Sequence, residues 1–577
     1  MLTESPVVRA VGPRVLFLMG AVITAAILLW THHLRLSGDL HGFTSIFFYL
    51  FVYQDYYAAV CELLILGAAV FVAALIPTDK LLQQAGEHPG TIAVAFAVAL
   101  SAGSLLVYHD HPLSMDEYTA YFQSQVFAAG HLAGRLPLPI MDWVIPPGFQ
   151  NFFLNVSSQT GEVASNYWPG HALLMAPFML AGIPWACNPV LSALTLLVIH
   201  RLAMYLFEDV QAAGLAVLLT VASPVMFGLG ISYYSMPAHL LCNSLYALLL
   251  VRPSPWRALA AGLVGSIALC LHNPLPHTLF ALPWMIWIIT RPRGLRLLAA
   301  LCAGYLPLSL LLGVGWYEFT NDLRNSVSVS GAHVDILAHV QALLGIFSRP
   351  DANVLLARFI AMAKTWVWAV PGIVLLAIYG AARWRRHPLC MLLAVSALTT
   401  LVGYVFFPQD QGHGWGNRYF HSAWMALPLL ATAAIFRPRL SRETAIAESA
   451  EPLLFGDAAS RSYMAACVLL TLVFGVGLQA WQMQRFIAAV LNQVPHYATT
   501  GPQVVILDVN PNYGFYVGDL VQNDPFLRGP VIRMMSHGLA EDTRMMAQFY
   551  PNLQLVSANH LGRVWSQKGA AHDASQR

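Results

Sequence analysis

Residues 58–76 read AAVCELLILGAAVFVAALI, an apolar run of 19 residues in which Glu62 is the single charged side chain. As a helix rising about 1.5 Å per residue, such a run crosses the roughly 30 Å hydrocarbon core of a bilayer. Comparable runs recur along the chain. We predict thirteen transmembrane helices, at about 15–31, 58–76, 91–107, 188–206, 212–230, 236–251, 258–274, 277–290, 297–316, 366–382, 389–407, 419–436 and 463–483. The sequence therefore predicts an all-α polytopic membrane protein.

The composition of the whole chain agrees with this fold class. Of 577 residues, 57% are hydrophobic and 10% are charged, whereas soluble domains carry about 25% charged residues. A set of soluble domains, a disordered protein and a nucleic-acid binder are thereby excluded, and a net charge of +2 indicates no polyanionic partner. The seven cysteines lie in or beside apolar runs and form no Cys-x-x-Cys motif, which favours buried thiols over disulfides or a zinc site.

The arginines predict the orientation in the membrane. Segment 170–186 is apolar but contains Pro177 and Pro184, so we interpret it as a half-inserted or interfacial element. With the N-terminus in the cytoplasm, the basic clusters then all lie on the cytoplasmic side, as the positive-inside rule requires. These clusters are at 201, 252–257, 291–296, 383–386 and 437–442.

The predicted spans and loops divide the chain into five parts. They are an N-terminal two-helix addition with a cytoplasmic loop (1–90), a transmembrane module (91–437) with large outer loops 108–187 and 317–365, a cytoplasmic linker (438–462), a last transmembrane helix (463–483) and an extracytoplasmic domain (484–577). In the last part, QVVILDV (503–509), PVIRMMS (530–536) and LQLVSAN (553–559) are typical of short strands, so we expect a small α/β domain.

The first outer loop carries two adjacent carboxylates, Asp116 and Glu117, just after the third predicted span. Ser114 precedes them, and aromatic and apolar residues recur at helical spacing as far as Phe127. This pattern predicts an amphipathic interfacial helix with an acidic pair at its N-terminus. The pair is open to two interpretations, because acids near a helix start also stabilise the helix through its dipole.

Two further motifs fall on the same predicted side of the membrane. SNYWPGHALLMAPF (165–178) places Tyr167 and Trp168 before the short apolar segment, and PQDQGHGWGNR (408–418) holds His413, Asn417 and Arg418 among three glycines. An arginine at the membrane boundary suits a lipid-linked phosphate, because a guanidinium can donate two hydrogen bonds to phosphate oxygens. Each motif alone also fits a simpler interpretation, an aromatic belt or an arginine that reaches for the interface.

Taken together, Asp116-Glu117-Tyr118, Tyr167-Trp168-Pro169-Gly170 and Asn417-Arg418-Tyr419 before a late span resemble the GT-C superfamily of membrane glycosyltransferases. The closest groups are bacterial relatives of protein O-mannosyltransferases and of lipid A aminoarabinose transferases, and the likeness covers about 108–440. Two departures stand out. The acidic loop follows the third span instead of the first, and the Lys-Pro-Pro element of the aminoarabinose group, with its phosphate-binding lysine, has no counterpart at 166–170.

The resemblance implies a function and a location. It implies a multi-pass protein of the bacterial inner membrane that takes a sugar from a polyprenyl-phosphate donor and transfers it, with inversion, to an extracytoplasmic glycan, lipid or protein. Asp116 stands at the position of the family's catalytic aspartate and would be the base, with Glu117 beside it. Arg418, and after it His413, would bind the lipid phosphate. Tyr167, Trp168 and Asn417 would complete the substrate site.

Two alternatives stay open on the sequence. No cofactor is certain, and the positions of His109 and His111 near Asp116 and Glu117 leave a divalent metal open, although they match no established ligand spacing. A transporter, flippase or ligase for lipid-linked glycan precursors would share the membrane body and the phosphate-binding arginine. It would not need a carboxylate at the start of an interfacial helix.

Overall fold

The computed structural model describes residues 11–37, 45–325, 345, 347–439, 452–497, 501–508 and 517–567. Within these residues seven helices are long and apolar enough to cross a membrane, or eight when the bent pair α10 (Val210–Val221) and α11 (Pro224–Gly230) counts as one span. Six shorter apolar helices have 10–17 residues. Each of the thirteen predicted spans overlaps one of these helices, so the prediction of an all-α polytopic membrane protein is confirmed.

The helices of the membrane body pack around α9 (Cys187–Phe207). In the most apolar 18 residues of the helix that contains α9, 61% of the residues are buried, whereas the value for α1 (Val11–Ser37) is 28%. The α10–α11 pair bends by 59°, where Pro224 begins the second helix. The remaining body helices are α5 (Pro89–Leu106), α9 (Cys187–Phe207), α12 (Met236–Leu250), α13 (Pro255–Cys270), α14 (Leu275–Ile289), α15 (Gly294–Leu308), η8 (Ser309–Val314), α16 (Gly315–Asn325), α18 (Ala352–Val367), α19 (Ile373–Arg383), α20 (Pro388–Val405), η9 (His421–Ala423), α21 (Ala426–Ile435), α23 (Ala458–Leu470), η10 (Thr471–Gly475) and α24 (Val476–Leu491).

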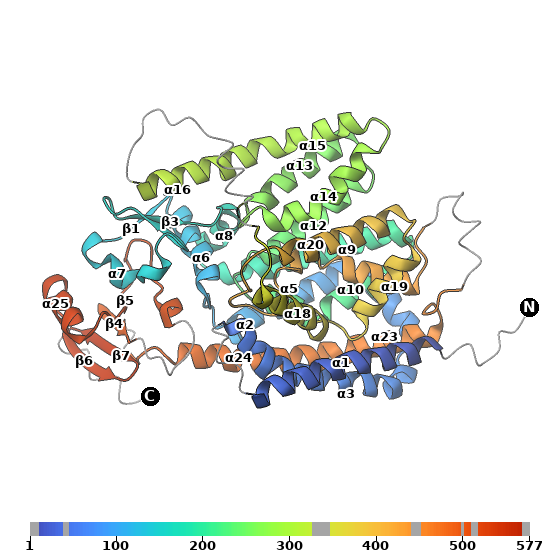
Figure 1. The fold of residues 1–577 in the computed structure, drawn as a ribbon, viewed down its shortest axis with the longest axis horizontal. Helices are drawn as coiled ribbons and strands as arrows, with labels where there is room; N and C mark the ends of the chain where they lie inside the picture. The colour runs from blue at the N-terminus through green and yellow to red at the C-terminus, as the bar shows by residue number, and fades with distance from the viewer. Residues whose placement is uncertain are drawn as a thin grey trace, which may run out of the picture.

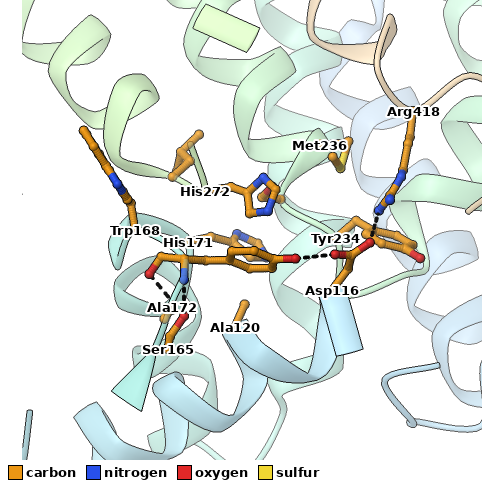
Figure 2. A pocket seen from close by; sticks show the side chains of 13 residues that line it. Asp116, Ala120, Ser165, Trp168, His171, Ala172, Tyr234, Met236, His272 and Arg418 are labelled. Carbon is orange, nitrogen blue, oxygen red and sulfur yellow. Dashed lines mark hydrogen bonds and ion pairs between the residues drawn. The ribbon is translucent and has the colours of Figure 1, made fainter. Parts of the chain in front are cut away.

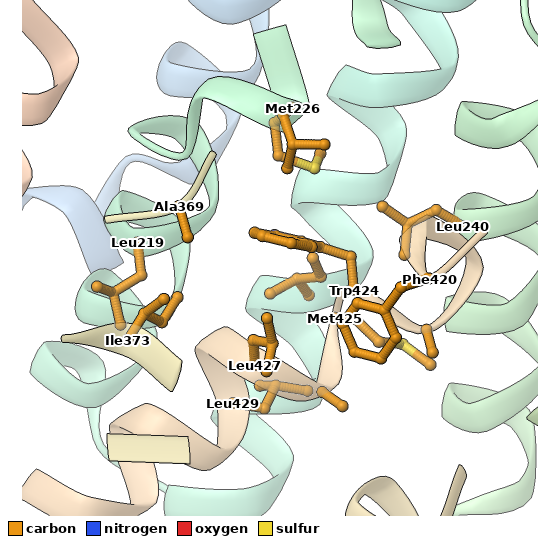
Figure 3. Packing of buried hydrophobic residues seen from close by; sticks show 14 of the residues in the cluster. Leu219, Met226, Leu240, Ala369, Ile373, Phe420, Trp424, Met425, Leu427 and Leu429 are labelled. Carbon is orange, nitrogen blue, oxygen red and sulfur yellow. The ribbon is translucent and has the colours of Figure 1, made fainter. Parts of the chain in front are cut away.

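Close packing in this body depends on small residues and on large buried rings. A Cβ on Gly262 of α13 would lie 2.1 Å from the carbonyl oxygen of Leu301 in α15, so the two helices approach at backbone distance. Figure 3 shows the fully buried Trp424 among Met226, Leu240 and other side chains contributed by several helices. These contacts fix the segment that leads from Arg418 into α21.

The N-terminal helices are joined to the body by a buried ion pair. α2 (Ile46–Leu50), η3 (Phe51–Asp55), α3 (Tyr56–Val72) and η4 (Ala73–Leu75) form one continuous helix, which α4 (Thr78–Glu87) follows. Asp55 accepts a 2.5 Å bond from Lys364 of α18 and a 2.6 Å bond from Trp368, and neither charged side chain is exposed. Removing one partner of such a pair leaves an uncompensated buried charge, so Asp55 has a structural role.

The first outer loop folds into short elements around α6 (Met115–Ala128) and α8 (Gly170–Leu180). A three-stranded sheet of order β1-β3-β2 lies beside them, built from β1 (Gly134–Arg135), β2 (Leu154–Val156) and β3 (Glu162–Ser165). The other turns are η5 (Leu138–Ile140), α7 (Met141–Val144), η6 (Pro147–Phe149) and η7 (Pro184–Ala186). α6 begins where the sequence predicts. Its buried residues pack against protein, because Met115, Tyr118 and Phe122 share a core with the C-terminal domain.

The C-terminal domain is the small α/β unit that the sequence predicts. Its sheet has the order β5-β4-β7-β6, with β4 (Gln503–Leu507) parallel to β5 (Val531–Met535) and antiparallel to β7 (Gly562–Ser566). β6 (Gln554–Asn559) pairs with β7, and η11 (Val517–Leu520) and α25 (Leu539–Phe549) complete the domain. The sequence analysis found β4, β5 and β6 but missed β7.

The first predicted outer loop, α16 and the C-terminal domain lie at one end of the molecule, on the left in Figure 1, whereas α18 packs in the membrane body. There Trp316 of α16 donates to the carbonyl of Tyr167, and Tyr118 donates to the carbonyl of Asn523. The predicted loop 317–365 is helical at both described ends, in α16 and α18. Its residues 326–344 and 346, like residues 440–451 of the predicted linker, lie outside the described parts of the chain.

The basic clusters meet away from this outer end. The backbone N–H of Arg439 donates to the carbonyl of Leu206, and a ring nitrogen of His387 lies 3.1 Å from the carbonyl oxygen of Arg439. The three segments that carry arginines 201, 383–386 and 437–439 therefore share one face of the membrane body.

Labelling of introduced cysteines should place these two ends on opposite sides of the membrane. Arg544 lies in the C-terminal domain and Arg385 in a basic cluster, and both side chains are exposed. We expect a membrane-impermeant maleimide to label Arg544→Cys in intact spheroplasts, and Arg385→Cys only after lysis. The parent protein provides the background from its own seven cysteines. Labelling of both variants in intact cells would contradict this topology.

Candidate active site

The three sequence motifs meet at the carboxyl group of Asp116. Tyr167 donates its hydroxyl hydrogen to Oδ1 of Asp116, and Nη1 of Arg418 lies 2.6 Å from Oδ2 (Figure 2). Asp116 is in the first turn of α6, with Ser114 as the N-cap residue. The carboxyl group of Asp116 thus binds side chains of distant segments. It does not cap the backbone N–H groups at the start of α6.

Arg418 is held by the glycine-rich loop that precedes it. Its side chain is 7% exposed, Nη2 donates to the carbonyl oxygen of Gln411, and its backbone N–H donates 2.9 Å to Oε1 of the same residue. A Cβ on Gly414 would lie 2.9 Å from Cδ of Arg418, and this glycine has φ +132°, so a larger residue could not take its place without strain. Nε of Arg418 has no hydrogen-bond partner. Among the described residues, Nε is thus a nitrogen of the guanidinium that has no partner.

Asp116 and Arg418 both line a cavity of about 650 Å³. Tyr167, His272, His413 and Tyr419 line it as well, and a cavity of this size matches typical small-molecule sites. Phenyl rings form part of its wall: Phe149, Phe152, Phe153 and Phe407. Asp116 and Arg418 also border a much smaller cavity of about 10 Å³, drawn in Figure 2, which Trp168 lines together with His171.

An apolar groove of about 220 Å³ lies beside the large cavity, between α18 and α20. Tyr404 and Tyr419 line both spaces, and their rings stack with centroids 4.5 Å apart. Arg358 at this groove donates to the carbonyls of Tyr404, Phe407 and Gln409. It thereby holds the backbone at the start of the loop that carries Arg418.

The charges of this site are set by their neighbours. Burial raises the pKa of Asp116, but the Arg418 guanidinium and the Tyr167 hydroxyl lower it by more, so the pKa lies below its ordinary value. Burial and the positive charge of Arg418 lower the pKa of His413 to about 3. His413 is therefore neutral at physiological pH. The predicted contact of His413 with a lipid phosphate would therefore be a hydrogen bond from a neutral ring.

Glu117 lies on the other side of α6 and lines neither cavity. Its buried carboxylate accepts hydrogen bonds from the hydroxyl of Tyr108 and from the backbone N–H groups of Leu113 and Tyr233, at 2.9–3.0 Å. The residue thus joins α6 to the end of α5 and to the segment before α12. Its contacts are those of a residue that positions Asp116.

The free energy of unfolding should depend on pH because of the ionisation of Glu117. Burial raises the pKa of Glu117 from 4.5 to about 7. Between these values the folded carboxyl keeps a proton that the unfolded carboxyl loses, so stability should fall as pH rises through this window, by about 3 kcal/mol. In Glu117→Gln this fall should be absent from the thermal midpoints measured between pH 4.5 and 7.5. Exposed Glu162→Gln is the matched control, and an unchanged pH slope in Glu117→Gln would refute the assignment.

The other predicted site residues take different positions. Tyr167 contacts Asp116 and packs edge-on against His272, with ring centroids 4.1 Å apart. Trp168 lines only the small cavity and packs against Gly313. Asn417 is buried, donates to Thr365 and accepts from Gln411, so it shapes the loop and does not face the large cavity.

The four residues that suggested a possible divalent metal, His109, His111, Asp116 and Glu117, do not form one site. Within the described ranges no three His, Cys, Asp or Glu side chains are grouped so that they could hold a metal ion. The oxygens of Asp116 and Glu117 accept hydrogen bonds from different partners, on different faces of α6. This donor set does not fit a shared metal with His109 and His111.

Sequence analysis missed three residues of the site. Tyr234 lies between Ser114 and His413 at hydrogen-bond distance from both, and its ring faces the Arg418 guanidinium at 5.0 Å. His272 lines both cavities, and Asp519 comes from the C-terminal domain. Tyr234 follows one predicted outward-directed span (212–230) and His272 lies at the outer end of another (258–274), so the topology alone was a signal for them. Asp519 had no such signal.

Together these features define a polytopic membrane protein whose predicted outer end holds an Asp–Arg pair in a cavity beside an apolar groove. No family model and no curated protein matches the sequence. Among solved structures, the chain is similar to ArnT from Cupriavidus metallidurans bound to undecaprenyl phosphate, with a TM-score of 0.50 and 14% identity over 83% of this chain and 98% of that one. The chain therefore has the fold of ArnT, as expected from the resemblance of its motifs to those of GT-C glycosyltransferases.

Two other solved structures match less well. The apo state of the same ArnT gives a TM-score of 0.47 at 14% identity, over 82% of this chain and 97% of that one. An Archaeoglobus fulgidus oligosaccharyltransferase in complex with Zn and sulfate gives a TM-score of 0.34 at 11% identity. The match covers 70% of this chain and 55% of that one.

Proposed function

We propose that this protein is a membrane glycosyltransferase. It transfers a sugar from a polyprenyl-phosphate donor to an acceptor on the extracytoplasmic side, in the inner membrane of a bacterium, with its N-terminus in the cytoplasm. The observation that carries the proposal is the contact between Asp116 and Arg418 at the wall of the large cavity. This contact supports the proposal because a candidate base and a candidate phosphate ligand line the same cavity.

The donor fits the two adjoining spaces. Arg418 binds the lipid phosphate, using the unpartnered Nε and the Nη1 group that now contacts Asp116. The polyprenyl chain leaves past Tyr404 and Tyr419 into the apolar groove between α18 and α20. ArnT, which has the same fold, has been solved with undecaprenyl phosphate bound, and this supports a lipid-phosphate donor here.

Donor binding activates the base in this proposal. When the phosphate draws Arg418 away, Asp116 loses the positive charge that lowers its pKa and becomes a stronger base. Asp116 then takes the proton of the acceptor hydroxyl or amine while that group attacks the anomeric carbon. The bond from this carbon to the phosphate oxygen breaks on the opposite face, so the configuration inverts. Arg418 stabilises the charge that the departing phosphate gains.

Incubation of the purified protein with a panel of polyprenyl-phosphate sugars tests the proposal. We expect one or more donors to release free polyprenyl phosphate, detected by mass spectrometry, in the presence of the matching acceptor. Movement of intact donor across a proteoliposome membrane without any release of polyprenyl phosphate would instead establish a transporter or flippase.

A further inference from the structure

The C-terminal domain supplies part of the wall of the large cavity. Its segment 517–523 docks on the start of α6, where Gln522 donates 2.7 Å to the carbonyl of Pro112. Tyr118 of α6 donates to the carbonyl of Asn523 at 2.6 Å and accepts from its backbone N–H at 2.8 Å. These bonds place Asp519 among the residues that line the cavity.

The carboxyl group of Asp519 is incompletely satisfied. The residue is 6% exposed, and its carboxyl group lies by the backbone N–H of Met115 at the start of α6. No lysine or arginine in the described parts of the chain forms an ion pair with it. A carboxyl group has several hydrogen-bonding positions, and within the described parts of the chain its side chain has no other polar contact than that with Met115, so capacity remains for a ligand. Burial and the negative charge of Asp116 raise the pKa of Asp519, as expected for a carboxyl that lacks a cation.

The surroundings of Asp519 indicate the chemistry of that ligand. Asp410, Asn166 and Asn273 line the same cavity, as do four phenylalanine rings. Nε2 of His413 is buried without a hydrogen-bond partner. Polar oxygens and nitrogens beside aromatic rings suit a sugar, whose hydroxyl groups form hydrogen bonds while its C–H faces pack on rings. The positive charge in the lining of this cavity is on Arg418, so the lipid phosphate belongs at Arg418 and the acceptor at Asp519.

We infer that Asp519 binds the acceptor, and that the acceptor presents a hydroxyl-rich saccharide to this part of the cavity. The carboxyl group of Asp519 accepts hydrogen bonds from saccharide hydroxyls and holds the attacking group near Asp116. The C-terminal domain thereby selects the acceptor. The inference rests on the proposed function and names the substrate class of the acceptor side.

Binding measurements on the full-length protein in detergent test the inference. The probes are a panel of methyl glycosides for the acceptor side, followed by saturation-transfer NMR titration, and undecaprenyl phosphate for the donor side. Asp519→Asn keeps an oxygen that can accept the Met115 N–H, so the start of α6 stays capped. We expect this variant to bind the best glycoside about 10- to 100-fold more weakly, and undecaprenyl phosphate as tightly as the parent protein does. Asp524→Asn is the matched control, because Asp524 directly follows the segment 517–523 but does not line the cavity.

Each other outcome is decisive. Unchanged glycoside affinity in Asp519→Asn would mean that the residue only caps α6, and the inference would be wrong. Failure of every methyl glycoside to bind the parent protein would also overturn it, even if undecaprenyl phosphate binds. Failure of undecaprenyl phosphate to bind would contradict the proposed function itself.

Discussion

Asp116→Asn should lower the rate of sugar transfer about 100- to 10,000-fold, which is the usual contribution of a general base. Asn has nearly the same shape as Asp, and its amide oxygen can still accept the Tyr167 hydroxyl that Asp116 binds. It cannot accept the proton of the acceptor. Binding of undecaprenyl phosphate should therefore persist while turnover, measured as release of polyprenyl phosphate, is lost.

The same substitution separates catalysis from helix capping. Asn caps helices about as well as Asp, so a residue that only stabilised α6 would tolerate the change with near-normal transfer. The control is Asp142→Asn, which alters an exposed carboxylate of α7 in the same outer loop. Near-normal transfer by a well-folded Asp116→Asn protein would remove the proposed mechanism and favour a transporter.

Loss of Arg418 should have the next largest effect. We expect Arg418→Ala to lower turnover about 100- to 1,000-fold, the range seen when a donor to the developing charge is removed, and to weaken binding of undecaprenyl phosphate. Arg418→Lys should restore only part of both, because an ammonium group cannot donate through a planar fork. Arg135→Ala, at an exposed arginine of the first outer loop, is the matched control.

The pH profile gives the Arg418 variants a second readout. Arg418 holds the pKa of Asp116 below its ordinary value, so in Arg418→Ala the pKa of Asp116 should rise. The residual activity should then be lost at a higher pH than in the parent protein as the solution is acidified. An acidic limb that does not move, together with unchanged binding of undecaprenyl phosphate, would place the phosphate site elsewhere.

Much of the fold follows from the sequence because membrane spans depend on local composition. Each apolar run is long enough to be recognised by itself, and the arginine clusters then assign every loop to a side. This reasoning already placed Asp116, Tyr167 and Arg418 on one surface. β7 escaped because Gly562–Ser566 is short and lacks a long apolar pattern, and its pairing with β4 is a tertiary contact.

The details of the site depend on side-chain direction, which the sequence does not reveal. Neighbours on a helix point about 100° apart, so only one of Asp116 and Glu117 could face the cavity, and the packing of α6 against α5 and the C-terminal domain decides which. The neighbouring side chains of Asn417 and Arg418 also point in different directions. Asn417 contacts Gln411 within the loop, and Arg418 contacts Asp116. The position of Asp519 in the cavity wall could not be predicted, because it depends on how the C-terminal domain docks on α6.

The docking of the segment 517–523 on α6 also bears on how the protein is made. Asp116 is synthesised early, whereas Asp519 follows α23 and α24, the last helix of the membrane body. During translation residues 108–187 emerge long before the polypeptide that completes the cavity wall has left the ribosome. A nascent chain thus carries an unfinished cavity, which is completed only when the C-terminal domain docks on α6. In the proposed reaction, acceptors would therefore bind to finished molecules and not to partly synthesised ones.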